Sequence, residues 1–410
     1  MSNLKPVKTA VIGSGNISYT YMNSLTSLFS IVDLVGCSDL VPEKSKARSE
    51  MFGIRQMTTE QILEDKEIEI VLNLTQIFNH TSVTKMILDA GKNAYSEKVI
   101  GCSFEEAKAN ADLAKSKGLR IGAAPDIYLG AAYQTARKLI DDGWIGDPIS
   151  AHAFCIRAGG RGYTAPMAFN NPNMGKQGTT MPYDMGGYYI NALVALLGPV
   201  NRVSGYSRRY AGPGKYMNPA HPNYLEATTP SAGASTVMGC LEFENGCLGN
   251  LMLCSDGFGP ELPRVEIYGT LGTLILPDPN GFGGYPMGGV NPYGGDVYMS
   301  RIGNDGLFKV PFSHAYGDTD PAIPTKTGRP VEACHNSNRG LAVADMAFAI
   351  RRNRPHRSSA ELAIHTVEIL DAIETASTTN QVVTLTTHPE RPAALPHGFI
   401  GAHAEAALDS

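Results

Sequence analysis

Residues 7–18 read VKTAVIGSGNIS, and this stretch decides the fold. Its first half is a short apolar run, typical of a buried strand, and its second half is a turn that opens a helix. Gly13 permits a tight turn, and Gly15 lets the backbone approach a phosphate, whose charge the helix N-terminus attracts. Ser18 stands where the usual pattern has a third glycine. The stretch therefore predicts a strand, a phosphate-binding turn and a helix.

An acidic residue ends the next apolar run and strengthens this interpretation. Asp39 closes the stretch LVGCSD at 34–39, near the distance of about 20 residues from the turn at which a ribose-binding carboxylate is expected. A carboxylate there accepts hydrogen bonds from ribose hydroxyls and repels a 2′-phosphate, which favours NAD over NADP. The alternative is a doubly wound domain without a cofactor. The turn residues predicted to contact the cofactor are Gly13, Gly15, Asn16 and Ile17.

Strand and helix patterns alternate over residues 1–125, which predicts an α/β fold with a doubly wound, parallel Rossmann sheet. The predicted helices are 17–29, 43–52, 82–90 and 104–117. The predicted strands are 7–12, 32–37, 68–74, 94–96 and 120–124. We expect this segment to be an NAD-binding domain.

The pattern changes after residue 125, and residues 126–387 predict a second, α+β domain with a large, mainly antiparallel open sheet. The predicted strands are 149–157, 200–210, 234–243, 247–255, 264–269 and 272–276. The predicted helices are 129–142, 184–197, 339–352 and 359–376. The Gly- and Pro-rich segment 277–333 predicts a long ordered excursion rather than regular structure. Residues 388–410 are rich in Pro and Ala and predict a surface arm.

Composition excludes several classes of protein. The 410 residues are 43% hydrophobic and 18% charged, as in globular proteins, and a net charge of −5 leaves no basic excess for nucleic acid. No apolar run is long enough to span a membrane, and the first residues hold no apolar signal core, so we expect a cytoplasmic protein. The seven cysteines are dispersed, and no histidine or cysteine spacing predicts a metal site.

Further motifs follow the glycine turn in a fixed order along the chain. They are Thr75 with His80, GKNAYSEK at 91–98, LIDDGWIG at 139–146, DMGGY at 184–188, IYGTLGT at 267–273 and RPHR at 354–357. With its motifs in this order, the chain resembles the Gfo/Idh/MocA family from about residue 7 to 385. The family is named for glucose–fructose oxidoreductase, inositol dehydrogenase and a rhizopine-catabolism protein. The resemblance implies a nicotinamide cofactor and a substrate CH–OH group on a sugar, cyclitol or related compound. It also implies a homodimer or homotetramer formed through the open sheet.

Glu97 and Lys98 match the family's Glu-Lys-Pro signature, with Val99 in place of the proline. The resemblance implies that Glu97 and Lys98 lie at the cofactor and that Lys98 also meets the reacting hydroxyl. A lysine there supplies positive charge against a developing alkoxide, and its pKa can fall in a desolvated site. The alternative is a surface Glu-Lys pair at a strand end.

Asp184 and Tyr188 lie four residues apart in a predicted helix, so both project from one face. Members of the family usually have a histidine at the position of Tyr188. A tyrosine can replace it as general base when a nearby cation such as Lys98 favours the phenolate, and glucose–fructose oxidoreductase is similar in this respect. Asp184 would orient Lys98 and a substrate hydroxyl, or act as a base itself. The alternative is that Tyr188 only packs in the core.

Other candidate residues follow strand ends, where doubly wound sheets hold ligands. By resemblance, the further cofactor contacts are Thr75, Asn79 and His80. The candidate substrate contacts are Asp126, Tyr128, Arg161, Tyr163 and Tyr183. For these residues a purely structural role is the alternative.

The sequence thus predicts an NAD-dependent oxidoreductase that acts on a ring hydroxyl of a sugar, glycoside or cyclitol. An alternative is a redox glycosidase, which oxidises carbon 3 transiently, eliminates the aglycone, rehydrates and reduces, and so recycles its NAD. A second alternative is a sugar or cofactor sensor without turnover. No nucleic acid or membrane partner is predicted.

Overall fold

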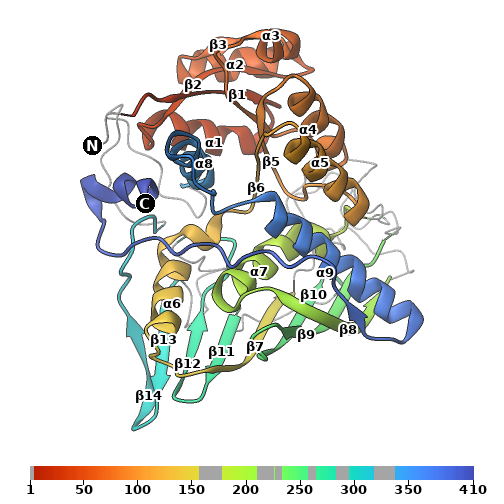
Figure 1. The fold of residues 1–410 in the computed structure, drawn as a ribbon, viewed down its shortest axis with the longest axis vertical. Helices are drawn as coiled ribbons and strands as arrows, with labels where there is room; N and C mark the ends of the chain where they lie inside the picture. Colours follow the sequence, from red (N-terminus) through yellow and green to blue (C-terminus); the bar gives the residue numbers. More distant parts are fainter. Residues whose placement is uncertain are drawn as a thin grey trace.

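The computed structural model describes residues 4–156, 178–209, 226, 233–256, 265–282, 295–317 and 338–410. Figure 1 shows an N-terminal sheet at the top, a C-terminal sheet at the bottom, and helices between them. Arg161 and Tyr163, two of the predicted substrate contacts, lie outside the described residues.

The N-terminal sheet is parallel throughout and has the order β3-β2-β1-β4-β5-β6. Its strands are β1 (Val7–Ile12), β2 (Val32–Ser38), β3 (Arg55–Gln56), β4 (Ile70–Asn73), β5 (Asn93–Ser96) and β6 (Ile121–Ala123). The chain crosses from one half of this sheet to the other between β1 and β4, the switch point at which such sheets bind ligands. The predicted Rossmann sheet is confirmed.

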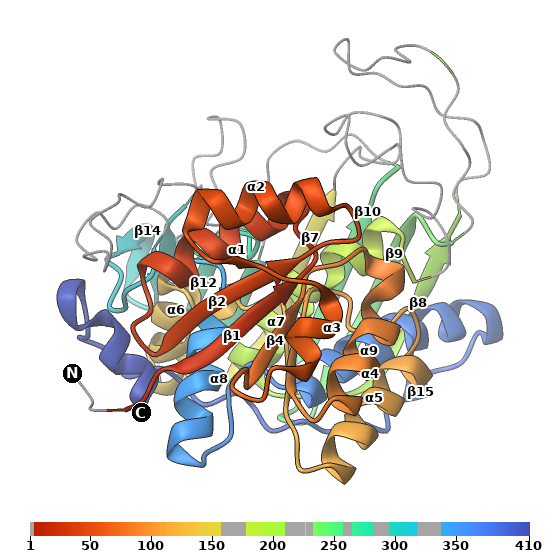
Figure 2. The same cartoon turned by 90° about the horizontal axis from the view of Figure 1, so that it is seen from above.

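Five helices connect these strands. They are α1 (Asn16–Ser27), α2 (Pro42–Phe52), α3 (Thr59–Glu64), α4 (His80–Asp89) and α5 (Phe104–Ser116), with a 3₁₀ turn, η1 (Ile77–Asn79), before α4. Helices α1, α4 and α5 each bury several residues against the rest of the domain. Figure 2 shows α1 with α2 on one side of β1 and β4, and α4 with α5 on the other. The sequence analysis missed α3, although Thr58 and Gln61 form a capping box at its start.

The second sheet has nine strands in the order β14-β13-β12-β11-β7-β10-β9-β8-β15. Its strands are β7 (Pro148–Ile156), β8 (Val200–Arg208), β9 (Thr236–Phe243), β10 (Leu248–Cys254), β11 (Val265–Gly269), β12 (Gly272–Leu276), β13 (Val297–Arg301), β14 (Asn304–Val310) and β15 (Val383–Thr384). The pairs are antiparallel except β7 with β10. The mainly antiparallel sheet is confirmed.

The prediction of an irregular excursion over 277–333 is wrong for β13 and β14. These strands form a hairpin around Gly303, whose φ of +86° is one that glycine adopts readily. The hairpin extends the sheet because β13 pairs with β12, with Met299 opposite Leu274. That pairing partner, rather than local composition, makes the segment a strand.

Helices cover one face of the nine-stranded sheet. They are α6 (Ala131–Asp141), which follows the 3₁₀ turn η2 (Ile127–Leu129), α7 (Met181–Leu197) and α9 (Ala360–Thr379). Figure 1 shows α7 and α9 on the side of this sheet that faces the N-terminal sheet. Almost every residue of α7 is buried, so it is the central helix of the molecule. Within the described residues, no helix covers the opposite face.

The end of the chain returns to the N-terminal sheet. Helix α8 (Leu341–Arg352) packs against β6, and the 3₁₀ segment η4 (Gly401–Asp409) packs against α8. Leu395 and Leu408 are buried, and Glu405 accepts a hydrogen bond from the Ile31 amide at 2.9 Å. In the segment 388–410, predicted as a surface arm, Leu395 and Leu408 pack into the protein, whereas Phe399 and Ile400 are exposed.

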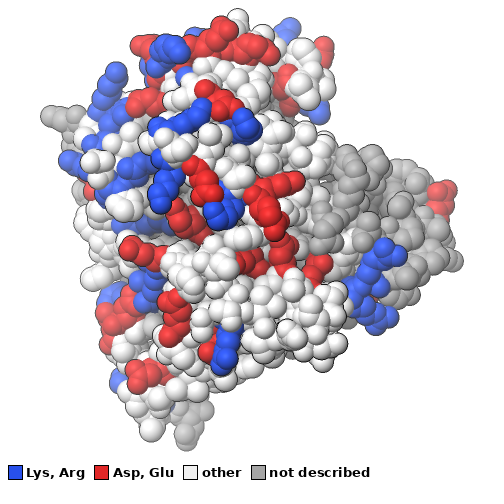
Figure 3. Space-filling view, turned by 45° about the vertical axis from the view of Figure 1, so that its right-hand side comes forward, with Lys and Arg blue, Asp and Glu red and all other residues white. Residues whose placement is uncertain are grey.

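Acidic and basic side chains lie side by side on the surface drawn in Figure 3. None of the helices in the described part of the chain combines the length and apolarity that a membrane crossing requires.

Candidate active site

The glycine turn after β1 has the shape of a dinucleotide cradle. Gly13 has a φ of +102°, and a Cβ there would lie 2.6 Å from the carbonyl carbon and oxygen of Leu74. A Cβ on Gly15 would instead have no atom within 4 Å, so space is open over this part of the turn. The first turn of α1 holds no acidic residue. These residues fit a bound pyrophosphate, which the helix N-terminus favours.

Asp39 is fixed beside this turn at the end of β2. Its Oδ2 accepts a hydrogen bond from the Ser14 amide at 2.7 Å, and its Oδ1 accepts one from the Val41 amide at 2.9 Å. A carboxylate oxygen can accept more than one hydrogen bond, so these contacts leave capacity for ribose hydroxyls. The geometry supports the predicted ribose role.

Thr75, Asn79 and His80 follow β4, and the structure gives His80 a bridging position. Its ring nitrogens lie 2.7 Å from the Val99 carbonyl oxygen and 3.1 Å from that of Thr75. Burial lowers the pKa of His80, whereas the two carbonyl oxygens favour its protonated form and raise the pKa. Thr75 and Asn79 are half-buried. His80 thereby ties the segment after β4 to the segment that carries Lys98.

Lys98 and Asp184 form an ion pair that joins the two halves of the molecule. Lys98 follows β5, whereas Asp184 lies in the first turn of α7. Burial by itself would lower the pKa of the Lys98 amine, but the nearby Asp184 carboxylate outweighs it and raises the pKa above its ordinary value. The direction is opposite to the expected fall, because Asp184 favours the charged form of the Lys98 amine. Behind it, Glu97 accepts a hydrogen bond from the buried Tyr21 hydroxyl at 2.8 Å.

Tyr188 lies one helical turn beyond Asp184 and faces two cations. The Lys98 Nζ lies 5.6 Å from its ring centroid, and the Arg339 Nη2 donates a hydrogen bond to its Oη at 2.8 Å. Tyr188 is 6% exposed. One cation thus lies over the ring of Tyr188 and the other binds its hydroxyl.

Arg339 is a residue of this site that the sequence analysis missed. It is 1% exposed and pairs with Asp126 at 3.9 Å. Arg339 lies 151 positions from Tyr188 in the sequence. The sequence predicted it only as the first residue of a helix. No local motif marks it, because only the fold brings the beginning of α8 against α7.

The described substrate candidates have partners within the protein. The Asp126 Oδ2 accepts hydrogen bonds from the amides of Gly340 and Ala342, both at 3.1 Å, and so caps α8. The Tyr183 hydroxyl donates to Asp371 at 2.5 Å. Both candidates are at most 1% exposed, and their role as substrate contacts stays a prediction.

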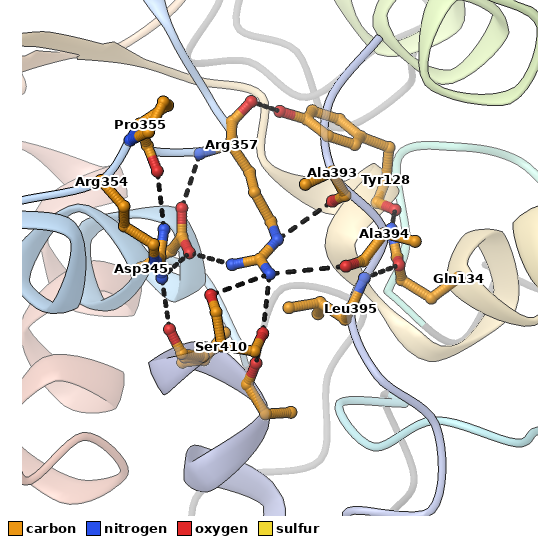
Figure 4. A network of polar contacts seen from close by, with 12 residues as sticks. Tyr128, Gln134, Asp345, Arg354, Pro355, Arg357, Ala393, Ala394, Leu395 and Ser410 are labelled. Atoms are coloured by element: carbon orange, nitrogen blue, oxygen red, sulfur yellow. Dashed lines mark hydrogen bonds and ion pairs between the residues drawn. The ribbon is translucent and has the colours of Figure 1, made fainter. Parts of the chain in front are cut away.

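Tyr128 belongs to a polar network at the end of the chain (Figure 4). Its hydroxyl donates to the Arg357 carbonyl at 3.0 Å, and the Arg357 side chain binds the buried Asp345 and the carbonyl of Ala393. Tyr128 is 2% exposed. The structure therefore gives this tyrosine a role in holding the terminal segment rather than a place at the reacting groups.

A parallel sheet with a glycine turn at its switch point, joined to an open antiparallel sheet, defines a two-domain protein of the dinucleotide-binding class. Residues 7–124 match the family model described as an oxidoreductase family with an NAD-binding Rossmann fold, and residues 133–275 match the GFO/IDH/MocA C-terminal domain. The chain belongs to the GFO/IDH/MocA family.

The curated relatives are distant. An uncharacterized oxidoreductase of Schizosaccharomyces pombe is 29% identical over 202 residues, which are 48% of this chain and 53% of that protein. The chain therefore spans about half the length of the first relatives it matches. The scyllo-inositol 2-dehydrogenase (NAD(+)) of Bacillus subtilis is 24% identical over 275 residues, 66% of this chain and 73% of that protein.

Solved structures share the fold over nearly the whole chain. Levoglucosan dehydrogenase, solved with NADH and levoglucosan, superposes with a TM-score of 0.73 at 18% identity and covers 93% of this chain and 99% of its own. An oxidoreductase from Agrobacterium radiobacter, solved with NAD+, L-tartaric acid and magnesium, has a TM-score of 0.70 at 15% identity and covers 93% and 98%. At identities of 18% and 15%, these similarities show a shared fold and nothing more.

Proposed function

We propose that this protein is an NAD-dependent oxidoreductase that acts on a ring CH–OH group of a sugar, glycoside or cyclitol. The observation that carries the proposal is the Lys98–Asp184 ion pair, which joins the two domains beside Tyr188. These three side chains bring together a cation, a carboxylate and a phenol. Groups of these kinds can remove the proton of a carbinol and stabilise the alkoxide that forms.

The chain's own residues divide the work as follows. The glycine turn and Asp39 hold the dinucleotide, which when bound supplies the hydride acceptor. Tyr188 takes the hydroxyl proton at its Oη, and Arg339 stabilises the phenolate through the hydrogen bond it donates. Lys98 stabilises the developing alkoxide, and Asp184 fixes the position of the Lys98 amine.

The relatives support the substrate class. One is named for scyllo-inositol and NAD+, and another is solved with NADH and levoglucosan. Both compounds carry ring hydroxyls. We extend this chemistry to the present chain because its cation follows β5 and lies near the phenol of α7.

A substrate screen tests the proposal and separates it from the alternatives. Purified protein is incubated with NAD+ and a panel of cyclitols, sugars and aryl glycosides, while absorbance at 340 nm and aglycone release are followed together. We expect NADH to form in proportion to oxidised product. Aglycone release without net change at 340 nm would indicate a redox glycosidase. Cofactor binding without turnover across the panel would indicate a sensor.

We further propose that the open sheet face forms a homodimer or homotetramer. Tyr206, Met238, Met252 and Phe154 lie opposite one another on β8, β9, β10 and β7 and make one row across the sheet. Tyr206 is 73% exposed and Met238 is 45% exposed, and an apolar row of this kind favours association. Light scattering should give an oligomer that Met238→Lys dissociates. A monomeric wild-type protein would contradict this.

A further inference from the structure

A cation from the second helix lies against the glycine turn. The Arg48 Nε donates a hydrogen bond to the Ser18 Oγ at 3.1 Å, and its Nη2 donates one to the Gly15 carbonyl at 3.3 Å. The Ser18 hydroxyl in turn donates to the same carbonyl at 2.6 Å. The side chain that replaces the usual third glycine thus connects the turn to α2.

The guanidinium of Arg48 is held in this orientation. Its central carbon lies 5.4 Å from the ring centroid of Tyr19, a cation–π contact, and the Tyr19 ring packs on Phe52 at 5.7 Å. The side chain is half-buried. A guanidinium restrained on several sides loses little further freedom when it binds a ligand.

The charge of Arg48 is not neutralised locally. Among the described residues, no carboxylate lies within 4.0 Å of its nitrogens, whereas exposed neighbours such as Lys46 and Glu50 form a pair on the same helix. The carboxylate of Asp39 accepts hydrogen bonds from the backbone amides of Ser14 and Val41. The positive end of α1 adds to the same local field. The turn therefore holds a cation at the carbonyl of Gly15, the residue whose Cβ position is open.

We infer that Arg48 is a pyrophosphate-binding residue of the cofactor site. A guanidinium recognises phosphate oxygens through paired, charge-assisted hydrogen bonds, and the backbone amides of the turn supply the remaining donors. The contact reaches the part that NAD and NADP share, so it adds affinity for both without selecting between them. The inference rests on the dinucleotide site of the proposed function.

Equilibrium binding tests this assignment without any turnover. NAD+, ADP-ribose and adenosine are titrated by calorimetry into the wild-type protein and into Arg48→Ala, Arg48→Lys and Lys44→Ala. We expect Arg48→Ala to weaken the binding of NAD+ and of ADP-ribose by about 10- to 100-fold. The binding of adenosine, which has no phosphate, should be unchanged. Arg48→Lys keeps the charge but loses the planar fork, so its loss should be intermediate. Lys44→Ala removes an exposed cation from the same helix and should have no effect.

Three outcomes would overturn the inference. If Arg48→Ala bound ADP-ribose as tightly as the wild-type protein, Arg48 would not contact the pyrophosphate. An equal loss for adenosine, or a lowered unfolding midpoint, would make Arg48 a structural residue of the turn. A loss confined to NADP+ in a parallel titration would place the contact at the 2′-phosphate instead. Because no substrate is present, failure to find a substrate would not affect the result.

Discussion

The glycine turn and the cluster of Lys98, Asp184, Tyr188 and Arg339 are built in opposite ways. The turn comes from one continuous stretch, and its shape follows from Gly13 and from the strand before it. The cluster comes from three segments, and the Lys98–Asp184 pair alone spans 86 positions of sequence. The first region is a local structure, whereas the second exists only once both sheets have packed.

In the proposed function, the two regions have separate tasks. The turn is formed by neighbouring residues of the chain, and it has the groups for binding a dinucleotide. The cluster lies between the two sheets and has the groups for moving a proton. Changes in the cluster should therefore slow chemistry and spare cofactor binding, and changes in the turn should do the reverse.

The largest effect is expected for Lys98→Met. This change removes the cation that opposes the developing alkoxide, and we expect kcat to fall by about 10³-fold, while the Kd of NAD+ changes little. Because the Lys98 pKa is raised, the wild-type enzyme should show no loss of activity from lysine deprotonation up to about pH 10. Steady-state kinetics and calorimetry measure the two quantities.

A surface lysine serves as the matched control for this variant. Lys85→Met breaks an exposed pair with Asp89 on α4 and should leave kcat unchanged. If Lys98→Met instead weakened NAD+ as strongly as it slowed turnover, the separation of the two regions would break down.

The next largest effect is a fall in the free energy of unfolding at acid pH. It arises at α9, the helix that packs against α7. His365 lies on α9, which packs on α7, and its Nε2 accepts a hydrogen bond from the Val200 amide at 3.0 Å. Burial lowers the pKa of His365 from 6.5 to about 4. Between these values the unfolded chain binds a proton that the folded chain does not, so stability falls as pH drops.

The expected loss is about 3 kcal/mol of unfolding free energy between pH 6.5 and 4, from the usual 1.36 kcal/mol per pKa unit. Urea unfolding at several pH values measures it. His365→Gln should flatten this part of the profile, although it lowers stability at pH 7. An unaltered slope in the variant would assign the acid sensitivity to other groups.

The smallest effect on stability is expected in the turn itself. Gly13→Ala places a Cβ against the Leu74 backbone at a positive φ, which costs about 1–3 kcal/mol. Gly15→Ala meets no atom within 4 Å and should keep wild-type stability, yet its methyl group occupies the cradle and should weaken NAD+. Thermal unfolding and NAD+ titration of the pair give the comparison. Normal NAD+ binding by Gly15→Ala would mean that the cofactor does not approach this part of the turn.

The sequence allowed the N-terminal sheet to be predicted almost strand by strand, because its signals are local. A buried parallel strand reads as a continuous apolar run, and β4 is buried at every position. Helix α5 was predicted over 104–117 and observed over Phe104–Ser116, since Ser103 caps its start. Such caps lie next to the residues they organise.

The rest depended on contacts between distant segments. The parallel pairing of β7 with β10, the pairing of β13 with β12, and the docking of Leu408 all require partners from other parts of the chain. Arg339 shows the same limit within the site. Lys98 and Asp184 could be predicted from family motifs, but the guanidinium behind Tyr188 has no motif of its own.

The most direct test of the central claim is the rate of NADH formation in Tyr188→Phe. The variant keeps the ring that lies near Lys98 and removes only the oxygen that Arg339 binds. In single-turnover mixing with saturating NAD+ and a substrate from the panel, we predict a rate lower by about 10²- to 10³-fold with the Kd of NAD+ unchanged. The unfolding midpoint should fall, because the buried Arg339 loses this hydrogen-bond acceptor. A rate close to that of the wild-type protein would show that Tyr188 only packs in the core, and it would contradict the account of this site.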